Sequence, residues 1–194
     1  MVKSPPMFSR ITLFLLLIII ASSCQNAAAA TQGEVFNVPD IGFHFVPPSG
    51  MIDRTSQSAR EVRNHAATNK TTSLILDLSS NEADTAPNWH RLWIIIRYRG
   101  QLANLSDVAA EEKMNTVLGG PKAIAVGKPK TSVLGGRAFV VSEFELNELP
   151  LLKHAKLFTT ICKGQILTLV LVSNSAAKVG AMEDSLKTLD FSSH

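Results

Sequence analysis

The sequence predicts an α+β domain whose mainly antiparallel sheet is covered by helices on both faces. In the segment Ile166–Val172, both sets of alternating residues are largely apolar, and a strand of that kind is covered on both sides. In Ala176–Leu189, apolar residues recur at spacings of three and four, as on a helix that covers one face. Neighbouring strands follow one another through short turns rather than through a helix after each strand, which favours antiparallel pairing.

The C-terminal part of the chain carries the strongest strand pattern. Arg137–Leu146 and Leu157–Cys162 are expected to be strands, and Lys163–Gly164 is a two-residue turn into the next strand. Lys130–Leu134 is expected to pair with Arg137–Leu146 across Gly135-Gly136, because two glycines suit a tight hairpin. The apolar stripe of the C-terminal helix consists of Val179, Met182, Leu186 and Leu189.

The N-terminal part of the domain is expected to contain shorter strands. Val35–Val38 and Gly42–Val46 are the first two, and the second ends at Pro47-Pro48-Ser49-Gly50. Ser73–Leu78 and Leu92–Tyr98 follow, joined by a polar loop.

Two helices are expected between the strands. Ser58–Ala66 is a short polar helix, and the second covering helix that the sheet needs is capped by Ser106 or Asp107. The second helix ends at Gly119-Gly120-Pro121.

The first 30 residues, Met1–Ala30, are expected to be a secretory signal peptide, and Thr31–His194 is expected to be a single domain. Lys3 and Arg10 give a positive n-region, and Ile11–Ala21 is an apolar h-region. The apolar run is short for a membrane span.

A second processing site is expected as an alternative within this segment. Ala21-Ser22-Ser23-Cys24 resembles the lipobox of bacterial lipoproteins, in which the cysteine is acylated and becomes the new N-terminus, although Ala21 stands where leucine is commonest. Ordinary cleavage near Ala28-Ala29-Ala30 would instead remove Cys24. Either route predicts an exported protein, periplasmic or extracellular, and a lipid on Cys24 is the one membrane attachment expected.

The expected mature domain is close to electrically neutral. Removing Met1–Ala30 takes away two of the 19 basic residues and none of the 16 acidic ones, which leaves 17 against 16 and a formal charge of +1. This balance gives no reason to expect nucleic acid or an anionic membrane as a partner. Cys162 is the sole thiol in Thr31–His194, so no internal disulfide is expected, and the cysteine is expected to be buried.

The order of these features resembles that of PsbP-like domains. The opening from Phe36 to Gly50 is similar to theirs, with Met51 where the family often has tryptophan. The strand Arg137–Val141, the long hairpin after it and the segment Ser185–Phe191 are similar as well. The resemblance covers most of Glu34–Phe191. It implies an α/β/α sandwich and non-enzymatic accessory or binding roles, and it transfers no site residue.

Catalytic motifs do not accompany this pattern. Gly119–Lys128 lacks the glycine spacing and the Ser/Thr of a phosphate loop, and neither G-x-S-x-G nor H-E-x-x-H occurs. The five histidines stand at no metal-ligand spacing. We therefore predict a protein that is not an enzyme, with no cofactor and no metal. The histidines are His44, His65, His90, His154 and His194.

One segment is richer in recognition chemistry than the rest. Trp89, Arg97 and Arg99 flank or lie within the strand Leu92–Tyr98, and tryptophan with arginine can stack on and pair with an anionic ligand. An envelope protein or a small anionic ligand is the expected partner. The structural alternative is that the tryptophans pack in the fold and the arginines lie at the sheet edge.

The predicted function is a non-catalytic binding or accessory module of the cell envelope. The alternative is a secreted hydrolase that uses carboxylates such as Glu143 and Glu145, which lie two residues apart and therefore on one strand face. Two glutamates on one strand are more often a solvated face or a salt-bridge partner for Lys156 than an acid–base pair.

Overall fold

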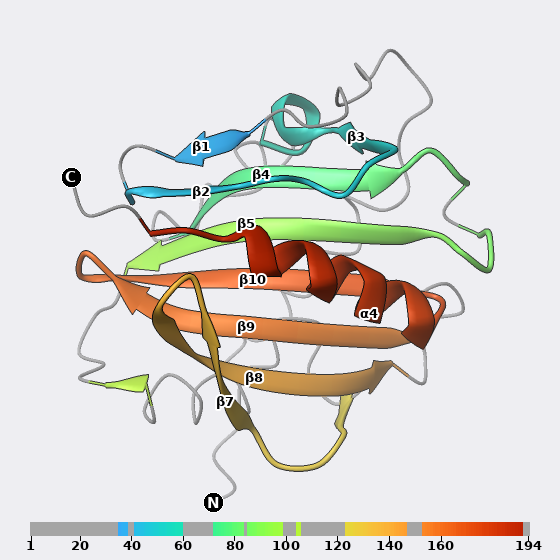
Figure 1. Ribbon diagram of the computed structural model, residues 1–194. Helices are drawn as coiled ribbons and strands as arrows, with labels where there is room; N and C mark the ends of the chain where they lie inside the picture. Colours follow the sequence, from blue (N-terminus) through green and yellow to red (C-terminus); the bar gives the residue numbers. More distant parts are fainter. Residues whose placement is uncertain are drawn as a thin grey trace, which may run out of the picture.

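The computed structural model describes residues 35–38, 41–59, 72–83, 85–98, 104–105, 123–146 and 153–191. In them the chain forms an eight-stranded antiparallel sheet, a two-stranded ribbon and a C-terminal helix (Figure 1). The elements are β1 (Phe36–Val38), β2 (Phe43–Phe45), β3 (Met51–Asp53), β4 (Thr72–Ser80), β5 (His90–Tyr98), β6 (Ala123–Ala125), β7 (Lys130–Leu134), β8 (Arg137–Leu146), β9 (His154–Cys162), β10 (Gln165–Ser173) and α4 (Ala176–Ser185).

The strand order of the large sheet is β3-β4-β5-β10-β9-β8-β6, and β7 pairs with β8 as well. Every pairing is antiparallel, so the predicted mainly antiparallel sheet is confirmed. The sequence pattern did not predict the three-residue strands β3 and β6, because neither alternates between apolar and polar residues as β1 and β2 do.

The sheet has two buried faces, which we call front and back. The front face lies under α4 and includes Leu167, Leu169 and Leu171 of β10, whereas Val170 and Val172 lie on the back face (Figure 1). Both sets are buried, so the predicted two-sided burial of this strand is confirmed.

A helix is described on the front face only. The predicted stripe of α4 and the 3-10 turn after it is buried against the front face of the sheet. The second predicted helix, from Ser106 or Asp107 to Gly119-Gly120-Pro121, lies outside the described residues, so helices on both faces are not shown. Residues 55–59 are helical, which overlaps the short polar helix predicted over Ser58–Ala66 at residues 58–59, and residues 60–66 lie outside the described residues.

The ribbon β1–β2 and the C-terminal segment close the front face. Phe43 and Phe45 of β2 are buried in the front core, as their alternation with His44 predicts. His44 and Asp190 form an isolated antiparallel bridge, in which each backbone N–H donates to the other's carbonyl, at 3.0 and 2.9 Å. The chain end is therefore tied to its beginning.

The hairpin β7–β8 curls over the front of the sheet (Figure 1). Gly135 and Gly136 have φ angles of 54° and 74°, the left-handed conformation that a two-residue turn of this hand requires. A Cβ atom on Gly135 would lie 2.6 Å from the carbonyl oxygen of Leu189. The predicted hairpin is thus confirmed, and its tip lies directly against the C-terminal segment.

Candidate functional site

An ion pair between Arg91 of β5 and Asp77 of β4 is buried on the back face. Asp77 is 0% exposed and Arg91 4%. Arg91 Nε donates to Asp77 Oδ1 at 2.6 Å, and Arg91 Nη2 donates to Asp77 Oδ2, so the contact is bidentate. The Ser58 hydroxyl donates to Asp77 Oδ2 and accepts from Arg91 Nη2 at 3.2 Å. The carboxylate is therefore fully engaged within the protein.

The segment after β3 fixes this ion pair from the outer side of β4. Asp77 accepts at its backbone oxygen from the N–H of Arg54 (2.8 Å) and donates its own N–H to Thr55 Oγ1 (2.9 Å). Arg54 Nε donates to Ser79 Oγ at 2.5 Å. The guanidinium carbon of Arg91 lies 4.8 Å from the centroid of the Trp93 ring, a cation–π contact. Because each partner is satisfied internally, the cluster is structural.

The sequence pattern did not predict this ion pair. Its available signal was Asp77, a charged residue among the apolar residues of the predicted strand Ser73–Leu78. For the segment Trp89–Arg99, one prediction was that its arginines lie at the sheet edge. For Arg91, which belongs to this segment, that prediction is wrong, because β5 lies between β4 and β10 and Arg91 is buried.

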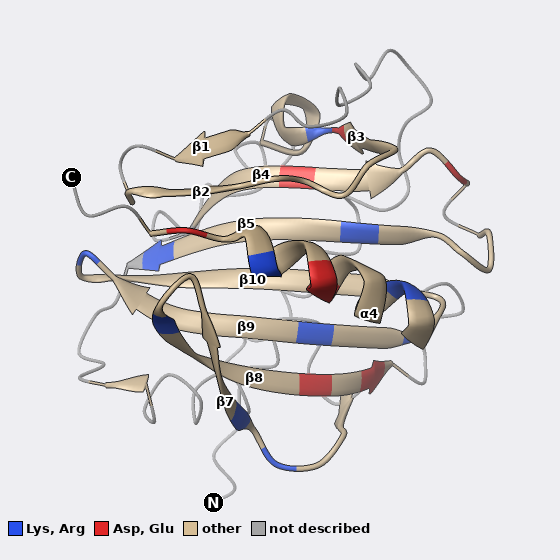
Figure 2. Cartoon of the chain, viewed as in Figure 1, with Lys and Arg blue, Asp and Glu red and all other residues tan. Residues whose placement is uncertain are grey.

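A second charged cluster joins the front face to α4. Lys156 Nζ donates to Glu183 Oε2 at 2.6 Å and lies 3.2 Å from Glu143 Oε1. Partial burial lowers the pKa of Lys156, but the two carboxylates outweigh burial and the pKa is raised overall. Figure 2 shows the basic position on β9 between the acidic positions of β8 and α4. The predicted ion pair between Glu143 and Lys156 is confirmed.

Glu145, the other carboxylate of the hydrolase alternative, is exposed at the end of β8. It lies opposite His154 in the β8–β9 register. Glu143 is held by Lys156, whose side chain is only 16% exposed. The two glutamates therefore differ in surroundings, one in a salt-bridge cluster and one in solvent.

The predicted binding residues are placed differently from one another. Trp89 is 4% exposed and belongs to the back core, and its carbonyl accepts from Ser173 Oγ at 2.8 Å. Arg97 is half-buried at the end of β5, opposite Ile166 of β10. Arg99 lies outside the described residues. The ring of Trp89 therefore packs in the fold, and recognition by this segment would depend on the arginines.

The described histidines and cysteine take structural positions. His44 Nε2 lies 3.4 Å from Asp190 Oδ2, and His90 Nδ1 lies 2.8 Å from the carbonyl oxygen of Asn88. Cys162 is buried and its thiol lies 3.6 Å from the carbonyl oxygen of Ile41, which confirms the predicted buried cysteine. Among the described residues, no group of three or more potential ligands could hold a metal ion. Cys24, His65 and His194 lie outside them.

The chain has a PsbP-like α/β fold. Its elements are the long antiparallel sheet, the helix α4 on the front face and the ribbon β1–β2. A search of solved structures finds cyanobacterial PsbP (CyanoP) from Synechocystis sp. PCC 6803, at a TM-score of 0.56 and 13% sequence identity. The match covers 89% of this chain and 99% of that chain. The predicted PsbP-like resemblance is confirmed at the level of fold.

Comparison by sequence adds no relative. No family model matches the chain, and no curated protein matches it. In the described part of the chain, no helix has the length and apolar character needed to cross a membrane.

Proposed function

We propose that the chain is a non-catalytic binding or accessory module that is exported to the cell envelope. The observation that carries the proposal is that the charged side chains of both clusters pair with one another. The Arg91–Asp77 pair satisfies its charges in the interior of the fold, and Lys156 pairs with Glu143 and Glu183 at the partly exposed rim of the front face. A catalytic carboxylate or base needs a proton-transfer partner in a substrate, and these groups are occupied by one another. The PsbP-like fold, whose resemblance implies non-enzymatic accessory roles, supports the same interpretation.

The proposal is tested first by turnover. Purified protein and its Glu143→Gln variant are assayed on panels of esters, peptides and glycans. We expect no turnover by either protein, because Glu143 is held by Lys156. Turnover that Glu143→Gln abolishes would instead support the hydrolase alternative with Glu143 and Glu145.

Binding by the Trp89–Arg99 segment is tested with small anions as probes. Phosphate, sulfate and citrate are titrated against the parent and against a variant with Arg97→Ala and Arg99→Ala, and chemical-shift changes are followed. We expect the double variant to lose the response, since guanidinium groups pair with such anions. A variant with Lys153→Ala and Lys178→Ala removes the same charge elsewhere and should respond like the parent. Equal responses by both variants would exclude this segment as the anion site.

Export and anchoring are tested at Cys24. If Cys24 is acylated, Cys24→Ala releases the protein from the membrane fraction into the soluble fraction. Mass spectrometry of the native N-terminus decides between the two processing routes. An N-terminus at Thr31 would contradict the lipid anchor and support ordinary signal-peptide cleavage.

A further inference from the structure

The strand β7 has an outer edge that is unpaired within the described residues. Gly135 and Gly136 form a two-residue turn, so Leu134 and Arg137 are the hydrogen-bonded closing pair. Hydrogen-bonded and non-hydrogen-bonded pairs alternate along an antiparallel ladder. The backbone N–H and C=O groups of Thr131 and Val133 therefore point away from β8. No described strand pairs with β7 on that side.

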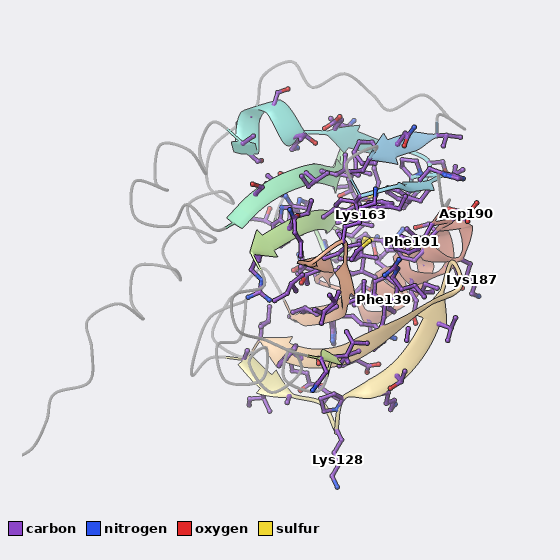
Figure 3. All side chains as sticks on the ribbon, turned by 90° about the vertical axis from the view of Figure 1, so that its left-hand side faces the viewer. Lys128, Phe139, Lys163, Lys187, Asp190 and Phe191 are labelled. Carbon is purple, nitrogen blue, oxygen red and sulfur yellow. The ribbon has the colours of Figure 1, made fainter. Side chains whose placement is uncertain are left out.

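The side chains along this edge suit an extended acidic segment. Val133 is 66% exposed, more than any other large apolar residue in the described part of the chain. Lys128 and Lys130 precede it in the chain, and Figure 3 shows Lys128 projecting away from the body of the molecule. The sequence contains no aspartate or glutamate between residues 113 and 142. The edge thus offers hydrogen-bonding groups, an apolar contact and positive charge together.

The neighbouring part of the same edge is built differently. β6 pairs with the end of β8, up to Ala125 opposite Phe144, and β7 pairs with its beginning, from Lys130 opposite Val141. Between these two pairings, the four residues 126–129 stand opposite only two residues of β8, 142 and 143. Such an irregularity, with Pro129 in it, interrupts a sheet edge and discourages uncontrolled pairing. Glu145 also lies opposite Ile124 there. The interruption therefore separates β6 from β7, and the residues of β7 itself carry no acidic side chain.

The β7 edge is also held in place before any partner arrives. The tip at Gly135 lies against Leu189, and Arg137 stacks over the ring of Phe191 at 4.8 Å. Arg137 Nη1 donates to the carbonyl oxygen of Ile161 at 2.9 Å, which joins the hairpin to β9. A fixed edge loses little conformational freedom when a strand adds to it.

We infer that β7 binds an extended, acidic segment of a partner protein by strand addition. Main-chain hydrogen bonds to Thr131 and Val133 would supply affinity, while Val133 and the two lysines would select alternating apolar and acidic side chains. A second copy of this chain fits less well, because it would bring Lys128 and Lys130 of both copies to one edge without a compensating carboxylate. The inference rests on the proposed binding function and specifies the partner.

The test uses the full chain and a labelled peptide of alternating glutamate and valine, about seven residues long so that it spans β7. Fluorescence anisotropy measures its affinity, with a lysine-for-glutamate peptide as the charge control. We expect the acidic peptide to bind at least about tenfold more tightly than the basic one, and Thr131→Pro, Val133→Glu and Lys130→Glu each to weaken it about tenfold. Proline is tolerated where an edge N–H faces solvent, so Thr131→Pro removes the donor and leaves the charge unchanged.

Val35→Glu is the matched control, because Val35 is an exposed valine (53%) outside the β7 edge. It should bind the acidic peptide like the parent. Circular dichroism checks that each variant folds, and Val133→Glu decides the test if Thr131→Pro does not fold. Equal affinity for both peptides, no binding of either, or full binding by Val133→Glu would overturn the inference. A dimer in sedimentation that Thr131→Pro dissociates would also overturn it, in favour of a second copy.

This result is independent of the turnover test. Hydrolysis that depends on Glu143 would contradict the proposed non-catalytic function whatever the peptide shows. Failure of the peptide to bind, with no turnover found, would remove the β7 partner and leave the binding module without this site.

Discussion

The front and back faces of the sheet are both buried, yet they are built from different chemistry. The front face has a large apolar core under α4, and its charged cluster lies at the rim, where Lys156 is still partly exposed. Among the described residues, the back face has fewer buried apolar side chains, and it buries an ion pair, Arg91 with Asp77, away from solvent. The same strands supply both faces, because neighbouring residues in a strand point in opposite directions.

The difference shows that an apolar strand pattern and a buried charge are compatible within one sheet. A buried ion pair contributes little net stability, since removing two charges from water offsets their attraction. Removal of one partner alone is costly, because the other charge stays buried without compensation. The two faces should therefore respond to substitution in different ways, and the following changes are ordered from the largest expected effect.

Asp77→Ala is expected to lower the free energy of unfolding by about 3–5 kcal/mol, because the Arg91 guanidinium loses its bidentate partner while it remains buried. Urea denaturation followed by circular dichroism measures the loss. The paired variant Asp77→Leu with Arg91→Met should recover most of the stability, since both charges are then gone. A single variant as stable as the parent would mean that the back face does not depend on this ion pair.

Leu169→Ala is expected to cost about 2–5 kcal/mol, because it leaves a cavity in the front core. Val170→Ala, at the next position and on the back face, should cost about 1.5–3 kcal/mol, since fewer atoms are removed. Both side chains are 0% exposed, so the pair compares the two faces at equal burial. Unchanged thermal stability in either variant would show that its face is not packed as described.

Gly135→Ala is expected to destabilise the front-face hairpin by about 2–4 kcal/mol, through the strain of a positive φ and overlap with the backbone of Leu189. Gly136→Ala is the matched control. It has a positive φ too, but open space around its Cβ, so about 1–2 kcal/mol is expected. Thermal melts of both variants measure the difference, and equal losses would argue against close contact between the hairpin tip and the C-terminal segment.

Lys156→Met is expected to cost about 1–2 kcal/mol at neutral pH, the smallest effect of the four, because its ion pairs lie at a partly solvated rim. The pKa of Lys156 is raised above 10.5 in the folded protein. The contribution of Lys156 is therefore fully present below the pKa of the unfolded chain and is lost as the pH rises through the folded pKa.

The pH dependence is checked by denaturation of parent and variant from pH 7 to pH 11. Their difference in unfolding free energy should be constant at first and shrink above about pH 10.4. The exposed Lys153→Met provides the control and should show no comparable change. A difference between parent and Lys156→Met that grows with pH would contradict the assigned role.

Much of the sheet could be predicted because its strands are long and apolar. The faces of β10, the Gly135-Gly136 hairpin and the α4 stripe each follow from local periodicity or turn chemistry. β3 and β6 could not be found, since their residues do not alternate between apolar and polar as those of β1 and β2 do.

The candidate site was less predictable than the fold. Trp89 and Arg97 were chosen for their chemistry, but the burial of Trp89 depends on contacts with distant segments such as Ser173. The Asp77–Arg91 pair joins residues 14 apart, and its geometry depends on a third segment at Ser58. Composition alone does not reveal such contacts, because they form only once the strands are arranged in the sheet.

By itself, the sequence determined that this is an antiparallel α+β domain with a two-sided core and a PsbP-like order of elements. Side-chain alternation and helical spacing are local properties, so they can be seen along the chain. Only the tertiary structure decided which charges are buried together, that Lys156 joins β9 to α4, and that no described strand pairs with the outer edge of β7. Those outcomes depend on strand order, and strand order is set by the packing of the whole sheet rather than by any one segment.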